Sequence, residues 1–214
     1  MRETTPATYR LYGRKNSGSF AVQVALEEIG VPYELSWVGS DAGEVAAFRK
    51  VNPTGRVPAL TLPDGTSMFE SAAILIHLAL LHPEAALAPP PGSSAHAKFL
   101  QWMVFLSANV YEAALRIYYS DRYSERGAAD AEAIRGRGTE DFLQFLGLIS
   151  EELGPYVLGA GYSIADVYLY MLGSWYPDGK AALYERLPAL GAHAEHLERR
   201  RALPKIDSEH AVSG

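Results

Sequence analysis

The chain has 214 residues, of which 48% are hydrophobic and 21% charged, and its formal net charge is −6. This length suffices for one large domain or two modest ones with hydrophobic cores. A mildly acidic chain lacks the concentrated basic surface that nucleic acids require, so we expect no nucleic acid partner. The one dense basic run, Arg199 to Arg201, is expected to be the solvated face of a helix.

The sequence contains no cysteine. This excludes disulfides, thiolate metal sites and a protein thiol as nucleophile, so any sulfur chemistry must use a thiol carried by a substrate. Residues 1–9 lack the apolar core of a signal peptide, and no stretch is apolar for long enough to span a membrane, so we expect a cytoplasmic protein without a membrane partner. His193 and His196 lie three residues apart, but nothing completes a ligand set, and we predict no metal site.

The first part of the chain alternates between β-rich runs and helical patterns. Strands are predicted at 9–12, 33–38, 57–62 and 67–69, and helices at 19–29, 43–50 and 72–81. The turn sequence at 63–66 joins the last two strands as a hairpin. A strand-helix-strand start requires a right-handed crossover and a parallel pair, and the hairpin adds an antiparallel strand. This order predicts a thioredoxin-like arrangement.

A proline-rich stretch at 89–92 then marks a stiff linker. After it the β pattern disappears, and apolar spacings of three and four predict helices at 95–120, 129–153, 163–175 and 188–201. We therefore predict an α/β thioredoxin-like domain at 1–83, a linker at 84–94 and an all-α domain at 95–214.

The most specific motif is the run Asn52-Pro53-Thr54-Gly55-Arg56-Val57-Pro58. Pro58 stands at the start of a predicted strand, where its missing N–H would damage a ladder. A cis peptide before Pro58 would present the backbone of Val57 outward, where an extended peptide could pair with it. The alternative is a proline on an edge strand or in a turn.

A second motif places Glu70 and Ser71 at the start of an apolar helix. Ser71 is a good N-cap, a helix N-terminus attracts a carboxylate, and Glu70 can accept a hydrogen bond from an ammonium group. One zwitterionic amino-acid head would satisfy both features. The alternative, a simple cap beside an acid, explains Ser71 but not the combination with the Pro58 loop.

The order of the N-P-x-G-x-V-P loop, the hairpin, the Glu-Ser pair and the apolar helix resembles the cytosolic glutathione S-transferases. The resemblance implies that Val57, before a cis Pro58, pairs with the cysteinyl backbone of glutathione, and that Glu70 and Ser71 hold its γ-glutamyl head. It also implies that Arg56 attracts the glycyl carboxylate. Glutathione would be the co-substrate.

A capping motif in the second half, Ser163-Ile164-Ala165-Asp166, is similar to that family's S-x-A-D box. In such a motif the serine side chain accepts a hydrogen bond from the backbone N–H of the acid, and the acid side chain accepts one from the backbone N–H of the serine. The expected role of Ser163 and Asp166 is therefore structural. The family resemblance further implies a homodimer.

The resemblance implies that a donor between Tyr12 and Ser19 stabilises the glutathione thiolate. We rank Ser17 first, then Asn16, then Ser19, with Tyr12 behind them. Helix capping is the alternative role of both serines. Gly18 stands where some members carry a cysteine, so disulfide exchange through an enzyme thiol is excluded.

The second substrate is expected to lie against the helical domain. Its aromatic stripe at 102–111 is assigned to packing, and Arg116, Tyr118 and Tyr119 are the candidates for the pocket. The leading hypothesis is a transferase that adds glutathione to an apolar electrophile, with peroxide reduction also open. The alternatives are a glutathione-dependent isomerase or dehalogenase, and a non-catalytic ligand carrier or regulatory protein on the same fold.

Overall fold

The computed structural model describes residues 8–210, so most of the segment assessed for a signal peptide lies outside the described residues. The chain forms two compact units. Among the described residues, the first unit holds 8–87 together with 199–210, and the second holds 88–198. The change of unit at Leu87 falls inside the predicted linker, whereas residues 199–210 belong to the first unit rather than to the helical one. Among the helices of residues 8–210, none combines the length and apolar character needed to cross a bilayer.

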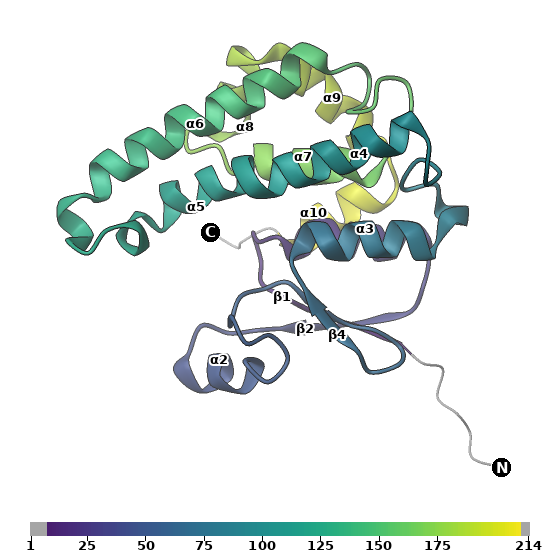
Figure 1. The fold of residues 1–214 in the computed structure, drawn as a ribbon, viewed down its shortest axis with the longest axis horizontal. Helices are drawn as coiled ribbons and strands as arrows, with labels where there is room; N and C mark the ends of the chain where they lie inside the picture. The colour runs from purple at the N-terminus through teal and green to yellow at the C-terminus, as the bar shows by residue number, and fades with distance from the viewer. Residues whose placement is uncertain (1–7, 211–214) are drawn as a thin grey trace. The chain divides into compact units, whose positions relative to one another are not determined.

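The first unit is built on a four-stranded sheet in the order β2-β1-β3-β4 (Figure 1). β1 pairs in parallel with β2 and antiparallel with β3, and β3 pairs antiparallel with β4. Its strands and helices are β1 (Tyr9–Gly13), α1 (Ser19–Ile29), β2 (Tyr33–Trp37), α2 (Ala42–Phe48), β3 (Ala59–Thr61), β4 (Ser67–Phe69), α3 (Ser71–Leu81) and α10 (Ala202–His210). This arrangement confirms the predicted thioredoxin-like domain.

α1 and α3 cover one face of this sheet, and α2 lies on the opposite face (Figure 1). The core between the sheet and the two helices contains fully buried Leu11, Leu26, Leu60, Ile74 and Leu78. α1 ends at Gly30 because that residue adopts a left-handed conformation with φ 77°. The third strand is shorter than the predicted 57–62, because Pro58 has no N–H to donate to a ladder.

The second unit consists of helices, as predicted, and confirms the glutathione S-transferase fold of an α/β domain with a helical partner. Its α-helices are α4 (Ser94–Phe105), α5 (Glu112–Tyr118), α6 (Ala131–Glu152), α7 (Ile164–Gly173), α8 (Gly179–Arg186) and α9 (Pro188–Glu198). Every residue of α7 is buried, so α7 forms the centre of this unit.

Three features of the helical part differ from the prediction. The helix predicted at 95–120 is interrupted by a π-helical segment at Leu106–Tyr111. α8 and α10 were not predicted, because both are short and their apolar residues are sparse. The basic run Arg199 to Arg201 lies in the turn before α10 and not on a helix face, and Arg200 forms a two-bond ion pair with Glu28.

α7 begins at the predicted capping box, in which Ser163 and Asp166 satisfy each other's backbone. The Asp166 carboxylate is fully buried and accepts hydrogen bonds from the N–H groups of Val157 at 2.7 Å and Ser163 at 2.8 Å. Its Oδ1 also lies 2.9 Å from Nε2 of buried His193 on α9. One carboxylate therefore links the start of α7 to the preceding loop and to α9.

We expect the Asp166→Ala substitution to lower the free energy of unfolding by about 3–5 kcal/mol, because it leaves several buried donors without an acceptor. Urea unfolding followed by circular dichroism measures this change. Glu195→Ala, at an exposed position on α9, is the control and should change stability by less than about 0.5 kcal/mol. A loss below about 1 kcal/mol for Asp166→Ala would contradict this role.

Candidate functional site

The register of the sheet brings three chain segments to one edge. Tyr12 on β1 pairs with Ala59 on β3, and Ala59 pairs with Phe69 on β4. Continuing this register by one residue places Pro58 between Gly13 and Glu70. The loop after β1, the Val57–Pro58 peptide and the start of α3 therefore meet at the same edge of the first unit.

The Val57–Pro58 peptide is cis, as the sequence predicted. Within residues 8–210, the backbone N–H and C=O of Val57 have no hydrogen-bond partner. Both groups are free to pair with an extended peptide, as an added strand would. Arg56, just before Val57, is exposed.

Asn52 organises this loop, a role that the sequence reading missed. Its side chain is 2% exposed, and its amide nitrogen donates to the carbonyl of Arg56 at 2.5 Å. Its Oδ1 accepts hydrogen bonds from the backbone N–H of Thr54 at 3.1 Å and from the Thr54 hydroxyl at 2.9 Å. These contacts fix the residues that precede Val57. An asparagine two residues before a Thr-Gly pair was the available indication.

Glu70 and Ser71 occupy the start of α3. Glu70 is exposed and adopts a left-handed conformation with φ 71°, which is strained for a residue other than glycine and is common at functional sites. Glu70, and not Ser71, is the N-cap, and buried Ser71 is the first helical residue. The prediction of Ser71 as N-cap was therefore displaced by one residue. The helix N-terminus still presents its first N–H groups beside an acid.

The hydroxyls of Ser17 and Ser19 share one acceptor in the loop after β1. Ser17 Oγ lies 2.8 Å and Ser19 Oγ 2.9 Å from the carbonyl oxygen of Arg14, and the two hydroxyl oxygens are 2.9 Å apart. Ser17 is half-buried, whereas Ser19 is fully buried. A Cβ on Gly13 would lie only 2.6 Å from Ser19 Oγ, so Gly13 leaves the space that this hydroxyl occupies.

The other two donor candidates lie in different surroundings. Asn16 is exposed and adopts a left-handed conformation with φ 51°. Tyr12 is on β1, and its ring packs against that of Phe48 of α2, with the ring centres 5.6 Å apart. Because side chains alternate along a strand, Tyr12 points to the α2 face of the sheet, opposite to the face that α1 covers.

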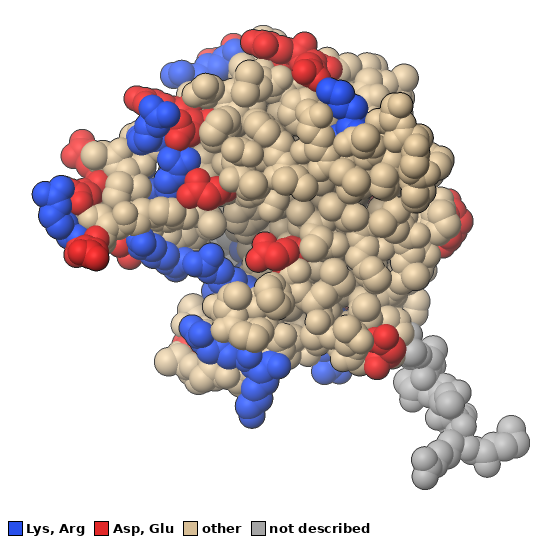
Figure 2. All heavy atoms as spheres, in the orientation of Figure 1, with Lys and Arg blue, Asp and Glu red and all other residues tan. Residues whose placement is uncertain are grey.

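Arg14 fixes the position of this loop and was also missed. Its guanidinium donates to the carbonyl oxygens of Val38 at 2.9 Å and Gly39 at 2.7 Å, just after β2. Further basic residues, Arg49, Lys50 and Arg56, are exposed next to α2. Figure 2 shows Lys and Arg side chains gathered over this part of the first unit.

In the second unit, Arg116 lies between two carboxylates. It donates to Glu112 at 2.9 Å and to Asp141 of α6 at 2.8 Å, and only 20% of its side chain is exposed. Burial alone would raise the pKa of Asp141, but hydrogen bonds from Arg116 and Arg137 hold this pKa below its ordinary value. Arg116 therefore carries a structural ion pair between α5 and α6.

Tyr118 and Tyr119 differ in their surroundings. The Tyr118 hydroxyl donates to the carbonyl oxygen of Trp175 at 2.6 Å, and burial raises the pKa of Tyr118. Tyr119 is exposed, and its ring lies 3.9 Å from the guanidinium carbon of Arg122. Both rings are exposed, Tyr118 by 53% and Tyr119 by 42%, and the Arg122 guanidinium lies over one face of Tyr119.

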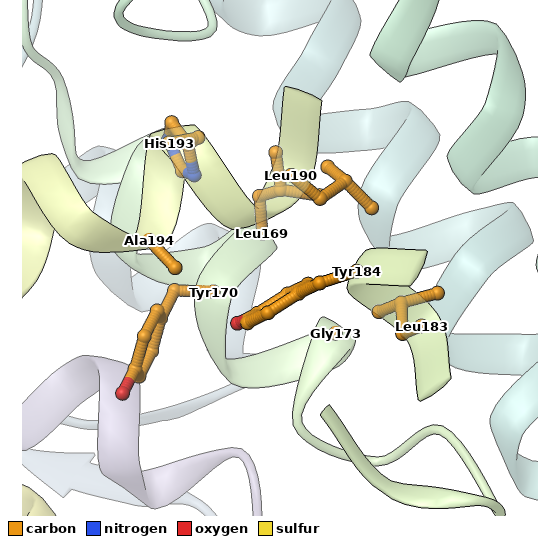
Figure 3. Close-up of a pocket in the computed structure, with 8 residues that line it drawn as sticks. All are labelled: Leu169, Tyr170, Gly173, Leu183, Tyr184, Leu190, His193 and Ala194. Atoms are coloured by element: carbon orange, nitrogen blue, oxygen red, sulfur yellow. The ribbon is translucent and has the colours of Figure 1, made fainter. Parts of the chain in front are cut away.

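Figure 3 shows a hollow within the second unit, between α7, α8 and α9. Its lining is mostly apolar, and it includes His193, which contacts Asp166, and Tyr170, which binds Lys180 at 2.8 Å and Glu198 at 3.3 Å. These polar groups are already paired, so we assign no chemistry to the hollow. Within residues 8–210 no group of three or more His, Asp or Glu side chains is arranged to hold a metal ion.

Comparisons with known proteins found similar chains. Residues 19–81 match the family model described as "Glutathione S-transferase, N-terminal domain". The chain is 26% identical to the glutathione S-transferase GstA of Escherichia coli O157:H7, over 96% of this chain and 98% of GstA.

Two solved structures resemble the chain over nearly its full length. One is a glutathione transferase homologue from Sulfitobacter with bound glutathione, with a TM-score of 0.85 and 25% identity, over 96% of this chain and all of the other. The second is a sphingomonad glutathione S-transferase complexed with glutathione, with a TM-score of 0.78 and 28% identity, over 95% of this chain and all of the other. Residues 19–81 are therefore a glutathione S-transferase N-terminal domain by their family match, and the whole chain is similar to glutathione S-transferases in sequence and fold.

Proposed function

We propose that the chain is a glutathione transferase that binds glutathione at the edge of the sheet and activates its thiol for attack on an apolar electrophile. The thiol loses its proton, and the thiolate sulfur forms a bond to an electrophilic carbon. A leaving group departs in a substitution, or the substrate takes up a proton in an addition. Glutathione is the co-substrate, and the reaction needs no metal.

The observation that carries this proposal is the convergence of Val57 and Glu70 at one end of the β3–β4 hairpin. The unpaired backbone of Val57 would bind the cysteinyl residue of glutathione. Glu70 would accept from the γ-glutamyl ammonium, while Ser71 and the first N–H groups of α3 would bind its carboxylate. Arg56, with the basic residues around α2, would attract the glycyl carboxylate.

Thiol activation would come from Ser17. A free thiol with a pKa of about 8.5 is only about 3% ionised at pH 7, and lowering its pKa by about two units raises this to about 75%. The difference corresponds to about 2.7 kcal/mol. A hydroxyl donating to the sulfur, close to the N-terminus of α1, can contribute to this stabilisation.

Buried Ser19 would permit Ser17 to turn toward the thiolate. Each hydroxyl has one hydrogen, and the carbonyl of Arg14 lies within reach of both. When Ser17 donates to the sulfur, Ser19 can still donate to Arg14, so no buried acceptor loses its partner. The N–H of Ser19 also donates to Ser17 Oγ at 3.3 Å. We therefore assign Ser17 as the donor and Ser19 as its supporting partner, with Asn16 and Tyr12 as the remaining candidates.

The electrophile would contact the helical unit through the exposed rings of Tyr118 and Tyr119. Arg116 would contribute mainly by shaping α5, since its guanidinium already pairs with Glu112 and Asp141. An aromatic surface of this kind suits an apolar substrate.

A homodimer is the proposed assembly. The first unit exposes Phe69 on β4 and Leu80 and Leu81 on α3, and the second exposes Leu100 and Val104 on α4. Leu80 and Leu81 are neighbours within α3, Leu100 and Val104 lie one turn apart within α4, and exposed apolar patches are typical of an interface between proteins. Figure 2 shows few charged groups over α3.

Ser17→Ala should raise the pKa of bound glutathione by about two units, toward its free value, because the variant lacks the proposed donor. Ultraviolet absorbance of the thiolate, recorded against pH with saturating glutathione, measures this pKa. Asn16→Ala is the matched control and should resemble the wild type. If Asn16→Ala alone raises the pKa, Asn16 is the donor. If the wild type binds glutathione without lowering the pKa, the chain is a carrier or regulatory protein.

Product analysis distinguishes a transferase from a glutathione-dependent isomerase. A transferase consumes glutathione in proportion to product, whereas an isomerase regenerates it. A panel of electrophiles, peroxides and isomerisable substrates, assayed with wild type and Ser17→Ala, therefore identifies the reaction class. Absence of any activity above the uncatalysed rate would contradict an enzymatic function.

Asn52→Ala should weaken glutathione binding by about tenfold, because the Thr54 N–H and the Arg56 carbonyl lose their partner and the Val57 loop is no longer fixed. Calorimetric titration measures the affinity. Thr54→Val removes only one of the three hydrogen bonds to Asn52 and should have a smaller effect. Unchanged affinity in a folded Asn52→Ala protein would refute this role.

Leu81→Glu should dissociate the proposed homodimer, because it places a charge in an apolar interface. Sedimentation velocity at micromolar concentration should then show a monomer for the variant and a dimer for the wild type. Glu132→Gln, a change at an exposed position in the first turn of α6, serves as control. A monomeric wild type would exclude the dimer.

A further inference from the structure

α10 packs against α1 through a buried polar cluster inside the first unit. Gln23 of α1 is 1% exposed, and its carbonyl oxygen accepts a hydrogen bond from His210 Nε2 at 2.9 Å. The amide nitrogen of Gln23 donates to Tyr33 at 3.1 Å and to Glu209 at 2.8 Å. Because the Gln23 nitrogen serves two acceptors, its oxygen must accept a hydrogen bond from His210, so Nε2 of His210 carries a hydrogen.

Two ion pairs join α1 to α10 and to the turn before it. Arg200 donates to both carboxylate oxygens of Glu28 at 2.7 and 3.0 Å, and Glu28 is 8% exposed. Lys205 binds Glu27 at 2.7 Å, and Tyr33 donates to the same oxygen of Glu27. Together with Gln23, the less exposed Arg200–Glu28 pair fixes the position of α10 along α1, whereas the exposed Lys205 pair contributes little.

The ring of His210 packs between two aromatic residues that border the proposed thiol-activating loop. The centre of its ring lies 5.3 Å from the ring centre of Phe20 and 5.3 Å from that of Trp37, in an edge-to-face arrangement with both. Phe20 follows Ser19 directly, and Trp37 pairs with Gly13 at the end of β1. His210 therefore touches the chain on both sides of the loop.

Backbone and side-chain bonds carry this contact to the proposed donor. The N–H of Phe20 donates to the carbonyl oxygen of Ser17 at 3.1 Å. On the other side, Arg14 donates to the carbonyl oxygens of Val38 and Gly39, which follow Trp37. The loop from Arg14 to Ser17 is therefore hydrogen-bonded to Phe20 on one side and to the residues after Trp37 on the other, and the His210 ring contacts both Phe20 and Trp37.

We infer that His210 is a positioning residue for the proposed thiol activation, and that α10 holds the Ser17 hydroxyl in place through the rings of Phe20 and Trp37. This inference rests on the proposed function of the loop. His210 acts through its neighbours and would not touch glutathione. Sequence reasoning alone places residue 210 in the helical domain, remote from the loop.

The surroundings of His210 favour its neutral form. Burial lowers its pKa, the nearby Lys15 acts in the same direction, and the carboxylates of Glu209 and Asp207 oppose the change. As the pH falls below the unfolded-state pKa of about 6.5, the unfolded chain binds a proton that the folded chain excludes, so this contact loses stability. Replacing His210 with phenylalanine removes this pH dependence and retains the ring contacts.

The test measures the pKa of bound glutathione in wild type, His210→Ala, His210→Phe and Lys205→Met. His210→Ala should raise this pKa by about 0.5–1 unit, which lowers the thiolate fraction at fixed low pH about threefold to tenfold. His210→Phe should give a smaller shift because the ring contacts remain. Lys205→Met removes an exposed ion pair of α10 without touching the rings, and should match the wild type.

Affinity for S-methylglutathione, which has no ionisable thiol, shows whether the binding site is intact in each variant. It should change less than twofold in His210→Ala, so that thiol activation and binding are separated. A thiol pKa equal to that of wild type in folded His210→Ala would overturn the inference while leaving the proposed function intact. An equal loss of S-methylglutathione affinity in His210→Ala and His210→Phe would also overturn it. An unshifted thiol pKa in the wild type would overturn both.

Discussion

β1 pairs with β2 on one side and with β3 on the other, and this pairing determines where the proposed site lies. The antiparallel register of β3 against β1 and β4 places Pro58 next to Gly13 and Glu70. A shift of one residue in this register would turn each side chain to the opposite face of the sheet. Leu11 and Leu60 are fully buried on the helix-covered face, so hydrophobic burial specifies the register that creates the site.

Buried polar groups with satisfied hydrogen bonds fix the details that hydrophobic burial leaves open. Gln23 in the first unit uses both amide N–H groups and its carbonyl, and Asp166 in the second accepts from two backbone N–H groups and lies against His193. An unsatisfied buried partner costs about 1–3 kcal/mol, so each group strongly favours a single arrangement of its neighbours. In the Val57 loop, the hydrogen bonds of buried Asn52 with Thr54 and Arg56 favour one backbone conformation in the same way.

Local sequence patterns were sufficient to predict the elements that are proposed to position glutathione. The turn sequence at 63–66 predicted the hairpin, and the combination of Pro58 with Glu70 and Ser71 predicted a site at its end. The choice between Ser17 and Ser19 could not be made this way, because both hydroxyls precede the same helix. Their different burial results from Gly13, which lies close to Ser19 only in the folded sheet.

Long-range packing accounts for most of what the sequence did not predict. α10 has nine residues with few apolar positions, and its partner Gln23 is far away in the chain, so neither periodicity nor spacing indicates their contact. The π-helical segment at Leu106–Tyr111 likewise lies within a continuous helical pattern, whose local propensities give no reason for a wider turn. Contacts between distant residues decide such features.

The first unit is assembled from both ends of the described chain, and this has a consequence for its synthesis on the ribosome. Residues 8–87 emerge first, but the hydrogen bonds that Gln23 accepts from His210 and Glu28 accepts from Arg200 form only after residues 199–210 have been translated. At about 5–20 residues per second, the intervening chain takes roughly 6–25 s to appear. During that interval the nascent α/β unit exposes the surface of α1 that α10 later covers, so the unit is completed only after the whole helical unit has been translated.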